Sequence, residues 1–256
     1  MLAEERRKRI IELLTKKGVI TVSELSETLG VVPITIRRDL ESLEKSEGIL
    51  IRTHGGAVLN GEPFLHKSLN TKETLNQAAK AKIGQKAASL VNDGETIILD
   101  EGSTCLEVAK ALQASKNSIT VVTNGIKVAL ELTPFPNITT VLVGGVCGHQ
   151  NYVAYGHETV ESFNKIRVHK YFMGIDALVP GYGISDGDPH QVQLKLAKAA
   201  SAQEVIGVAD HSKVGKIALA HVGPLSIMNL LIMDSPVPEG FKQALNDEQI
   251  GLIELD

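Results

Sequence analysis

The chain of 256 residues has no tryptophan, two cysteines and few aromatic side chains, which make up 4% of the sequence. Cys105 and Cys147 lie far apart and have no metal-binding spacing, so we expect a reduced, cytoplasmic protein without a metal or other cofactor. No run of about 20 apolar residues is present, which excludes a membrane-spanning helix, and we expect no signal peptide before the first helix. The hydrophobic residues, 43% of the chain, still suffice for an aliphatic core.

The segment from Val22 to Leu40 predicts two short helices separated by a tight turn, the layout of a helix-turn-helix DNA reader. In the second helix the apolar side chains at i, i+4 and i+7 form the stripe that should be buried: Ile36, Leu40 and Leu43. The opposite arc carries hydroxyl and guanidinium groups suited to nucleic acid: Thr35, Arg37 and Arg38. Taken alone, this arc is also consistent with a solvated amphipathic helix.

The first helix of the pair has its own start and stop signals. Thr21 followed by Glu24 has the spacing of a capping box, and Gly30 supplies the turn after the helix. The apolar face that should be buried is Val22, Leu25 and Leu29. An initial helix over residues 4–16 would complete a three-helix core through Ile10, Leu13 and Leu14.

Two short β-prone runs follow at residues 49–59, in ILIRTHGGAVL. A glycine pair between such runs predicts a hairpin. With Arg52 and His54 at its base, the hairpin is similar to the wing of a winged helix, which lays positive side chains along the phosphate backbone.

Three of these segments carry a family signature: RRKRIIELL at 6–14, TIRRDL at 35–40 and RTHGGAV at 52–58. Together they resemble the DeoR-type bacterial transcriptional regulators. The resemblance implies a winged helix-turn-helix domain over residues 1–58. It also implies that Thr35, Arg37 and Arg38 contact DNA in its groove. Arg52 and His54 would lie near the phosphate backbone of the DNA.

Two features depart from the family pattern. Val32 stands where the family usually has a serine N-cap, and Pro33 follows at a first helical position. The lost cap should weaken the helix start by about 0.5–2 kcal/mol unless another group substitutes. The link from Lys45 to Gly48 is one residue longer than usual, which would change how the wing is set against the helix.

The net charge of −4 is unevenly divided along the chain. Residues 1–58 hold ten Lys and Arg against nine Asp and Glu, so they are net +1 and the remaining residues are net −5. A reader this weakly basic has modest non-specific affinity and needs oligomerisation to bind DNA tightly. Because two-fold DNA sites usually mirror a protein two-fold, we expect a dimer or tetramer.

The second part of the chain predicts a mostly parallel sheet. Residues 59–76 lose apolar periodicity and indicate a linker, a helix is expected over about 72–90, and residues 77–256 form the larger domain. Near-continuous apolar strands alternate with helices, which is typical of a parallel sheet covered on both faces. The expected strands are 96–100, 119–124, 139–145, 171–176, 205–210 and 230–234. Their polar carboxyl ends should converge on one ligand crevice.

The most informative of these strand ends is DEGST at residues 100–104. Here the strand is followed by a glycine turn and by hydroxyl residues at the start of a helix. Free backbone N–H groups and the helix dipole favour an anion such as phosphate there, although Ser103 and Thr104 could instead cap the helix. Asp176 would suit sugar hydroxyls, or satisfy loop amides. Lys195 and Lys213 could neutralise a phosphate, or be solvated.

The family resemblance extends from about residue 78 to the carboxyl end through DEGST, TN, GG, GIDA and ADHSKVG. It implies a Rossmann-like α/β sensor domain that resembles ribose-5-phosphate isomerase and binds a phosphorylated sugar. The site carried over from the family motifs is Asp100, Gly102, Ser103, Thr104, Thr123, Asn124, Asp176, Lys195 and Lys213. Glu101 stands at a usually small position, where its charge would oppose a phosphate unless it turns away, and Gln191 replaces an acid.

Two hypotheses of different classes follow. The favoured one is a DNA-binding regulator, a repressor of a sugar-metabolism operon whose operator affinity drops when a sugar phosphate binds. The alternative is a sugar-phosphate isomerase-like enzyme with an accessory DNA-binding module, in which Asp176 and Lys195 would be the base and the polarising group. Gln191 removes an obvious second carboxylate from that site, so we expect no enzyme.

Overall fold

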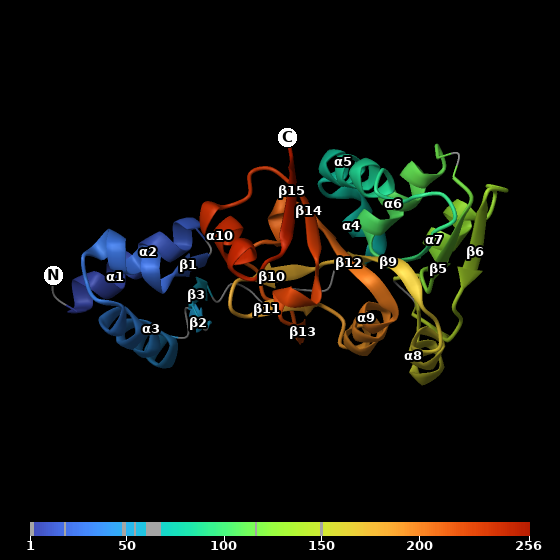
Figure 1. Cartoon of the computed structure of the whole chain (residues 1–256). Coiled ribbons are helices and arrows are strands. Elements are labelled where there is room, and N and C mark those ends of the chain that lie inside the picture. The colour runs from blue at the N-terminus through green and yellow to red at the C-terminus, as the bar shows by residue number, and fades with distance from the viewer. Residues whose placement is uncertain are drawn as a thin grey trace.

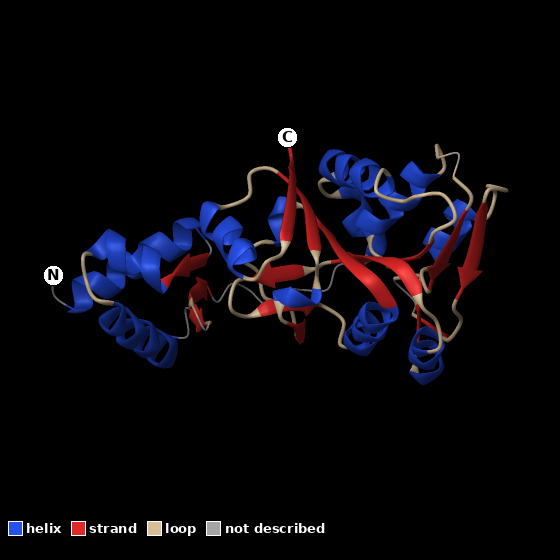
Figure 2. Ribbon diagram, viewed as in Figure 1, coloured by secondary structure: helices blue, strands red, loops and turns tan. Residues whose placement is uncertain are grey.

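The computed structural model describes residues 3–17, 19–47, 50–53, 55–59, 68–115, 117–148 and 151–256. Figure 1 shows a small helical domain at the N-terminal end and a larger α/β domain that contains the carboxyl end. In the larger domain the strands form a central layer with helices on both sides (Figure 2). Among the described residues, no helix has the length and apolarity needed to cross a membrane.

The N-terminal domain is a winged helix-turn-helix, as the sequence predicts. Its helices are α1 (Ala3–Lys17), α2 (Val22–Leu29) and α3 (Pro33–Glu47). Its antiparallel sheet has the order β1-β3-β2, built from β1 (Val19–Thr21), β2 (Leu50–Arg52) and β3 (Gly56–Leu59). The wing is the hairpin of β2 and β3. The sequence does not predict β1, because three residues are too few to reveal a strand period.

The predicted local signals set the ends and the inner face of α2. The Thr21 hydroxyl accepts the Glu24 backbone N–H at 3.1 Å, and the Glu24 carboxylate accepts the Thr21 backbone N–H at 2.9 Å, which completes the capping box. Gly30 ends the helix with φ of 65°, a left-handed conformation that favours glycine. The predicted apolar stripes are buried at Val22, Leu25, Leu29, Ile36, Leu40 and Leu43.

The larger domain is built on a seven-stranded sheet whose neighbouring strands are all parallel. In spatial order the strands are β15 (Gly251–Leu255), β14 (Leu230–Asp234), β12 (Ala202–Ala209), β9 (Val168–Gly174), β4 (Thr96–Leu99), β5 (Ile119–Thr123) and β6 (Ile138–Leu142). The chain runs outward from β4 to β5 and β6, then returns to the other side of β4 to add β9. The strand order therefore reverses between β4 and β9, and ligand crevices in such sheets form beyond the carboxyl ends of the strands at this point.

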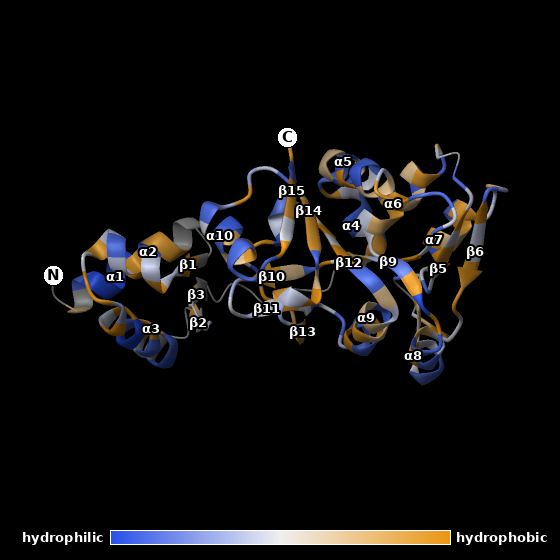
Figure 3. Ribbon diagram, viewed as in Figure 1, coloured by the Kyte–Doolittle hydropathy of each residue, from blue (hydrophilic) through white to orange (hydrophobic). Residues whose placement is uncertain are grey.

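Helices cover both faces of this sheet, as predicted. On one face Ile97 and Leu99 of β4 pack with α5 (Gln77–Ala88), α6 (Ser103–Leu112) and α7 (Ile126–Leu132). On the other face Ile98 belongs to the core formed with α8 (His157–Asn164), α9 (His190–Ser201) and α10 (Glu239–Asp247). Figure 3 shows hydrophobic residues along β14 and β6 and polar residues over much of α8. Each buried strand thus supplies side chains to two cores, which is why its sequence is almost continuously apolar.

Several short elements are absent from the sequence prediction. A second, antiparallel sheet of order β10-β11-β13 contains β10 (Ala177–Val179), β11 (Gly183–Asp186) and β13 (Ala220–Gly223). A further pair joins β7 (Val146–Cys147) to β8 (Ala154–Tyr155), and two 3₁₀ turns are η1 (His211–Lys213) and η2 (Leu225–Ile227). Elements of two to four residues leave no measurable period in the sequence.

The helix predicted over residues 72–90 is in fact two helices. α4 (Leu69–Thr74) and α5 are separated at Leu75 and Asn76, and Asn76 has φ of 50°, which no helix interior tolerates. α4 lies within the stretch predicted as a linker, 59–76, of which residues 60–67 fall outside the described chain.

Candidate nucleic-acid interface and ligand pocket

The outward face of α3 carries the side chains predicted to meet DNA. Arg37 and Arg38 are exposed, and Thr35 beside them is half-buried. The apolar stripe of α3 packs into the domain core on the opposite side. The guanidinium groups are therefore directed to solvent, where a phosphate or a base edge could reach them.

Part of the basic cluster at residues 6–9 has a structural role. Arg6 is buried and its guanidinium donates to the Asp39 carboxylate, at 2.5 Å from Nε and 3.2 Å from Nη2, while Arg7 Nε lies 3.4 Å from the same group. Asp39 is 3% exposed. The bidentate contact ties α1 to α3 and leaves the aspartate of TIRRDL unavailable to DNA.

Arg52 in the wing is turned toward α3. Its Nε donates to the Glu44 carboxylate at 2.9 Å, and its backbone N–H donates to the same carboxylate at 2.8 Å. These bonds set the wing against the carboxyl half of α3. His54, predicted beside Arg52 near the DNA backbone, lies outside the described residues, as does the end of the 45–48 link at Gly48.

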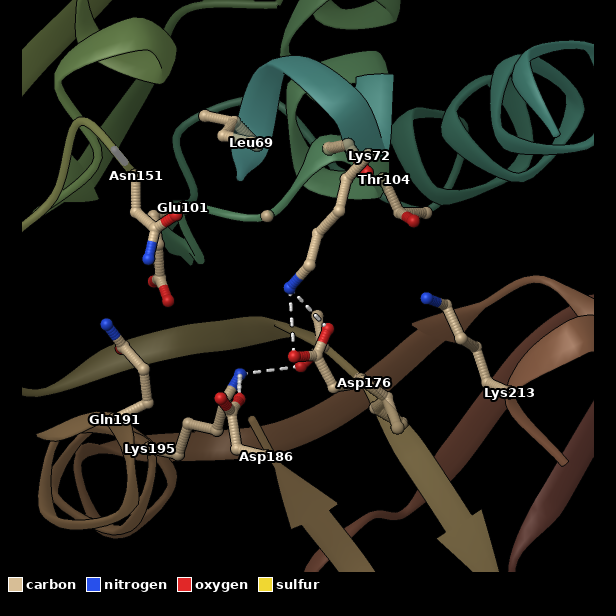
Figure 4. A pocket seen from close by; sticks show the side chains of 14 residues that line it. Leu69, Lys72, Glu101, Thr104, Asn151, Asp176, Asp186, Gln191, Lys195 and Lys213 are labelled. Atoms are coloured by element: carbon tan, nitrogen blue, oxygen red, sulfur yellow. Dashed lines mark hydrogen bonds and ion pairs between the residues drawn. The ribbon is translucent and has the colours of Figure 1, made fainter. Parts of the chain in front are cut away.

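A narrow pocket with an internal volume of about 50 Å³, open to solvent at its mouth, lies at the switch point of the large sheet, beyond the carboxyl ends of β4 and β9. Figure 4 shows its lining, with Lys72 reaching in from α4 on one side and Gln191 and Lys195 from α9 on the other. The lining residues are Leu69, Lys72, Glu101, Gly102, Ser103, Thr104, Asn151, Gly174, Ile175, Asp176, Asp186, Gln191, Lys195 and Lys213.

Six of the nine residues predicted for a ligand site line this pocket: Gly102, Ser103, Thr104, Asp176, Lys195 and Lys213. Asp100, Thr123 and Asn124 do not. The Thr123 hydroxyl accepts the Gly125 backbone N–H at 3.0 Å, and the Asn124 side-chain amide donates to the Ala154 carbonyl at 2.8 Å. Their bonds hold the turn after β5 together, so the polar strand ends do not all converge on one crevice.

Asp100 sits beneath the pocket in a fully buried ion-pair network. Lys195 Nζ donates to its carboxylate at 2.6 Å and to the Gly174 carbonyl at 2.6 Å, and Lys198 Nζ donates to its second oxygen. Burial raises the pKa of Asp100, but Lys195 and Lys198 outweigh it and keep that pKa below its usual range. Lys195 also lies 3.5 Å from Asp186. Most of the Lys195 charge is therefore already balanced by protein carboxylates.

Glu101 does not turn away from the pocket. Its carboxylate lies 3.1 Å from Lys198 Nζ, and its side chain is among those that face the cavity in Figure 4. Burial, and then the neighbouring charge of Asp100, raise the pKa of Glu101 to about 7. Part of the molecules therefore carry a neutral Glu101 near neutral pH, which reduces the repulsion expected for an anion.

The start of α6 offers uncapped backbone N–H groups to the pocket. Its N-cap is Gly102, which makes no side-chain capping bond, and Ser103 and Thr104 are already inside the helix. The hypothesis that their hydroxyls cap α6 is therefore wrong. A Cβ on Gly102 would meet no atom within 4 Å, so the space in front of the helix is open. Such an end attracts anions through its N–H groups and dipole.

Comparison with known proteins places both domains. The DeoR-like helix-turn-helix domain matches residues 6–62, and the DeoR C terminal sensor domain matches residues 75–235. The chain belongs to the DeoR family. The HTH-type transcriptional regulator GolR of Listeria innocua is 33% identical over 247 residues, which cover 96% of each chain. The glycerol-3-phosphate regulon repressor of Escherichia coli is 31% identical over 256 residues, covering 98% of this chain and 99% of that one.

As a DeoR-family member, the chain is a transcriptional regulator with a DNA-binding helix-turn-helix domain. Among solved structures, ribose-5-phosphate isomerase A from Neisseria gonorrhoeae aligns with 58% of this chain and 56% of its own, with a TM-score of 0.40 and 20% identity. At that score the likeness adds nothing to the family assignment.

The charged pocket or network residues of this DeoR-family chain that the sequence does not predict include Lys72, Asp186 and Lys198. Lys72 Nζ spans the pocket to the two Asp176 carboxylate oxygens, at 2.8 and 2.9 Å. Lys198 is fully buried below the pocket. Gln191 is 3% exposed, and its Oε1 has no hydrogen-bond partner. No motif marks them, because they come from separate elements that only the fold brings together.

Proposed function

We propose that this DeoR-family regulator represses a sugar-metabolism operon as a homo-oligomer, and that a small phosphorylated sugar or polyol bound in the switch-point pocket releases it from operator DNA. The observation that carries the proposal is the uncapped start of α6, with the Ser103 and Thr104 hydroxyls beside it and Lys213 lining the same cavity. Backbone N–H groups, hydroxyls and an ammonium group are the donors that bind phosphate. The relative named a glycerol-3-phosphate regulon repressor supports the same class of ligand.

The phosphate would lie at α6 and Lys213 rather than at Lys195. Lys195 is committed to Asp100 and the Gly174 carbonyl, so a phosphate would have to break those bonds to use it. Lys195 would instead hold the pocket wall in position. Lys213 lines the same cavity and points into it across from Thr104 (Figure 4).

The hydroxyl groups of the ligand would lie on the opposite wall. Gln191 Oε1 is buried and without a partner, which is costly unless a donor arrives. A ligand hydroxyl would supply that donor. Asp176 offers carboxylate oxygens on the same side, and carboxylates accept hydrogen bonds from sugar hydroxyls.

α4 would couple the pocket to the reader. Its Lys72 is paired with Asp176, and the chain before α4 leads through residues 60–67 to the wing strand β3. A ligand hydroxyl on Asp176 would compete with Lys72 and loosen the hold of the pocket on α4. An effector that prefers the loosened arrangement shifts the regulator away from its DNA-binding state in proportion to that preference.

The test is fluorescence anisotropy of the full-length protein on duplex DNA from upstream of its own gene, titrated with a panel of phosphorylated sugars and polyols and their unphosphorylated forms. We expect one phosphorylated compound to release DNA and its unphosphorylated form to have no effect. Lys213→Ala should keep DNA affinity and need at least about tenfold more effector, the weight of a charge-assisted hydrogen bond. Lys165→Ala, an exposed lysine at the end of α8, is the matched control and should behave as wild type.

Two results would contradict the proposal: release by an unphosphorylated sugar, or an unchanged effector titration for Lys213→Ala. The same mixtures test the enzyme alternative, which the pKa of Glu101 near 7 favours because a base of that pKa suits proton transfer. We expect no conversion of any sugar phosphate. Conversion that Glu101→Gln abolishes would establish an isomerase instead.

A further inference from the structure

Two large apolar side chains stand in solvent at the start of α3. Val32 is 60% exposed and Ile34 is 54% exposed, and among the described residues of the N-terminal domain they are the exposed large apolar side chains. Two apolar neighbours in the sequence do contribute to the core: Ile36 is fully buried, and Val31 is partly buried against it. The domain itself therefore gains nothing from keeping Val32 and Ile34 apolar.

Ile34 lies on the same face of α3 as the outward guanidinium groups. Residues four apart in a helix are neighbours on its surface, so Ile34 lies next to Arg38. Ile36, two residues further on, points to the opposite side and into the core. Isoleucine is also a poorer helix former than alanine, because its branched side chain loses rotamer freedom. Helix stability therefore does not account for Ile34 either.

The major groove of DNA offers one apolar feature to such a side chain, the C5-methyl group of thymine. In helix-turn-helix proteins the first residues of the recognition helix reach the base edges, and Ile34 is the second residue of α3. We infer that Ile34 contacts a thymine methyl group in each half of the operator and that Val32 lines the same contact. This rests on the proposed placement of α3 in the groove.

Ile34 is then a specificity-determining residue beside Arg38. Arg38 can bind guanine or phosphate through charge, whereas Ile34 distinguishes thymine from bases that lack the methyl group. The exposed positive charge of Arg37 and Arg38 on both sides of this contact favours DNA over a second protein surface as its occupant. A second copy of the chain is the competing occupant, and the test includes it.

The full-length protein first selects its sites from a random duplex library. Each thymine of a selected site is then replaced singly by deoxyuridine, which lacks only the methyl group. We expect one thymine in each half-site to lose roughly fourfold in affinity on replacement, the ratio that burial of one methyl group (~0.8 kcal/mol) gives. Ile34→Ala should bind the thymine site more weakly and lose the difference between thymine and deoxyuridine there. Leu219→Ala, an equally apolar and 74% exposed position in the other domain, should keep the wild-type profile.

The binding results for Ile34→Ala and for the wild type distinguish failure of the methyl contact from failure of DNA binding itself. If Ile34→Ala binds the selected site with an unchanged thymine and deoxyuridine profile, the methyl contact is wrong while the DNA-binding role of the reader stands. If the wild type selects no sequence, the placement of α3 on DNA fails and the inference fails with it. If sedimentation shows that Ile34→Ala alters the oligomeric state, the side chain lies between copies, which also overturns the methyl contact.

Discussion

The two domains treat their charged groups in opposite ways. The reader buries the Asp39 carboxylate against Arg6 and leaves Arg37 and Arg38 in water. The sensor buries charges of both signs beneath its pocket, where Asp100 and Lys198 are fully buried. A surface that must meet a polyanion needs available cations, whereas a pocket that must select a small ligand needs a wall fixed before the ligand arrives. Buried charges can provide such a wall only if each has its partner.

The largest effect is expected when one buried cation is removed from the sensor. Lys198→Met keeps the length of the side chain but leaves Asp100 and Glu101 with one positive partner fewer. Breaking a buried ion pair from one side typically costs about 3–5 kcal/mol, so we expect a loss of that size in the free energy of unfolding. Urea denaturation followed by circular dichroism measures it.

Lys110→Met is the matched control, because Lys110 pairs with Glu107 at the surface of α6 with its side chain 41% exposed. Exposed pairs are worth about 0–1 kcal/mol, so this variant should lose little. Equal losses in the two variants would show that the buried network has no special weight. Adding Glu101→Gln to Lys198→Met should restore part of the stability, because it removes one of the uncompensated carboxylates.

Loss of an exposed cation from the reader should lower DNA affinity and leave the stability of the fold nearly unchanged. Arg38→Ala should leave the free energy of unfolding within about 0.5 kcal/mol of wild type, because the side chain lies in water. Operator affinity should fall by about 1–3 kcal/mol, or roughly five- to 150-fold, which at the upper end removes specific binding at working concentrations. Anisotropy titrations at several salt concentrations measure the affinity. Arg9→Ala is the control, since Arg9 is exposed on α1 and paired with Glu12. Normal operator binding by Arg38→Ala would place a different face of α3 in the groove.

How far the fold could be predicted from the sequence depends on whether a feature is set by nearby or by distant residues. The apolar stripe of α3, the capping box at Thr21 and the buried strand at 96–100 each depend on neighbours a few residues away, so the sequence predicts them. The strand order and the sheet of β10, β11 and β13 depend on pairing between distant segments, for which a single sequence carries no period.

The pocket residues likewise fall into those in a contiguous motif, which the sequence predicts, and those that only the fold brings together. The DEGST motif at 100–104 is contiguous, and its helix start lines the pocket as a local reading of the sequence predicts. Lys72 and Lys198 are lysines on ordinary helices, and nothing local distinguishes them from solvated ones. Lys72 lies 104 residues from Asp176, and Lys198 lies 98 residues from Asp100. These pairs come together only because β4 and β9 lie side by side at the switch point.

Glu101 gives the smallest but most selective test, because it stands between the buried network and the pocket. Its pKa of about 7, raised from an ordinary value of 4.5 by burial and by Asp100, means that the folded protein holds a proton there that the unfolded chain has released. The contribution of Glu101 to stability therefore falls as pH rises from about 4.5 to about 7, and Glu101→Gln should remove that part of the pH dependence.

The same ionisation should act on the proposed effector. As pH rises through about 7, Glu101 gains a negative charge beside the start of α6, and the affinity of wild type for a phosphorylated ligand should weaken relative to Glu101→Gln. We expect the ratio of the two dissociation constants to change by about 0.5–1 kcal/mol, or two- to fivefold, between pH 6 and pH 8. The second ionisation of the phosphate, near pH 6, is common to both proteins and cancels in the ratio. A ratio that stays constant would mean that Lys198 neutralises Glu101 throughout this range, and that the buried network shields the pocket from its own carboxylate.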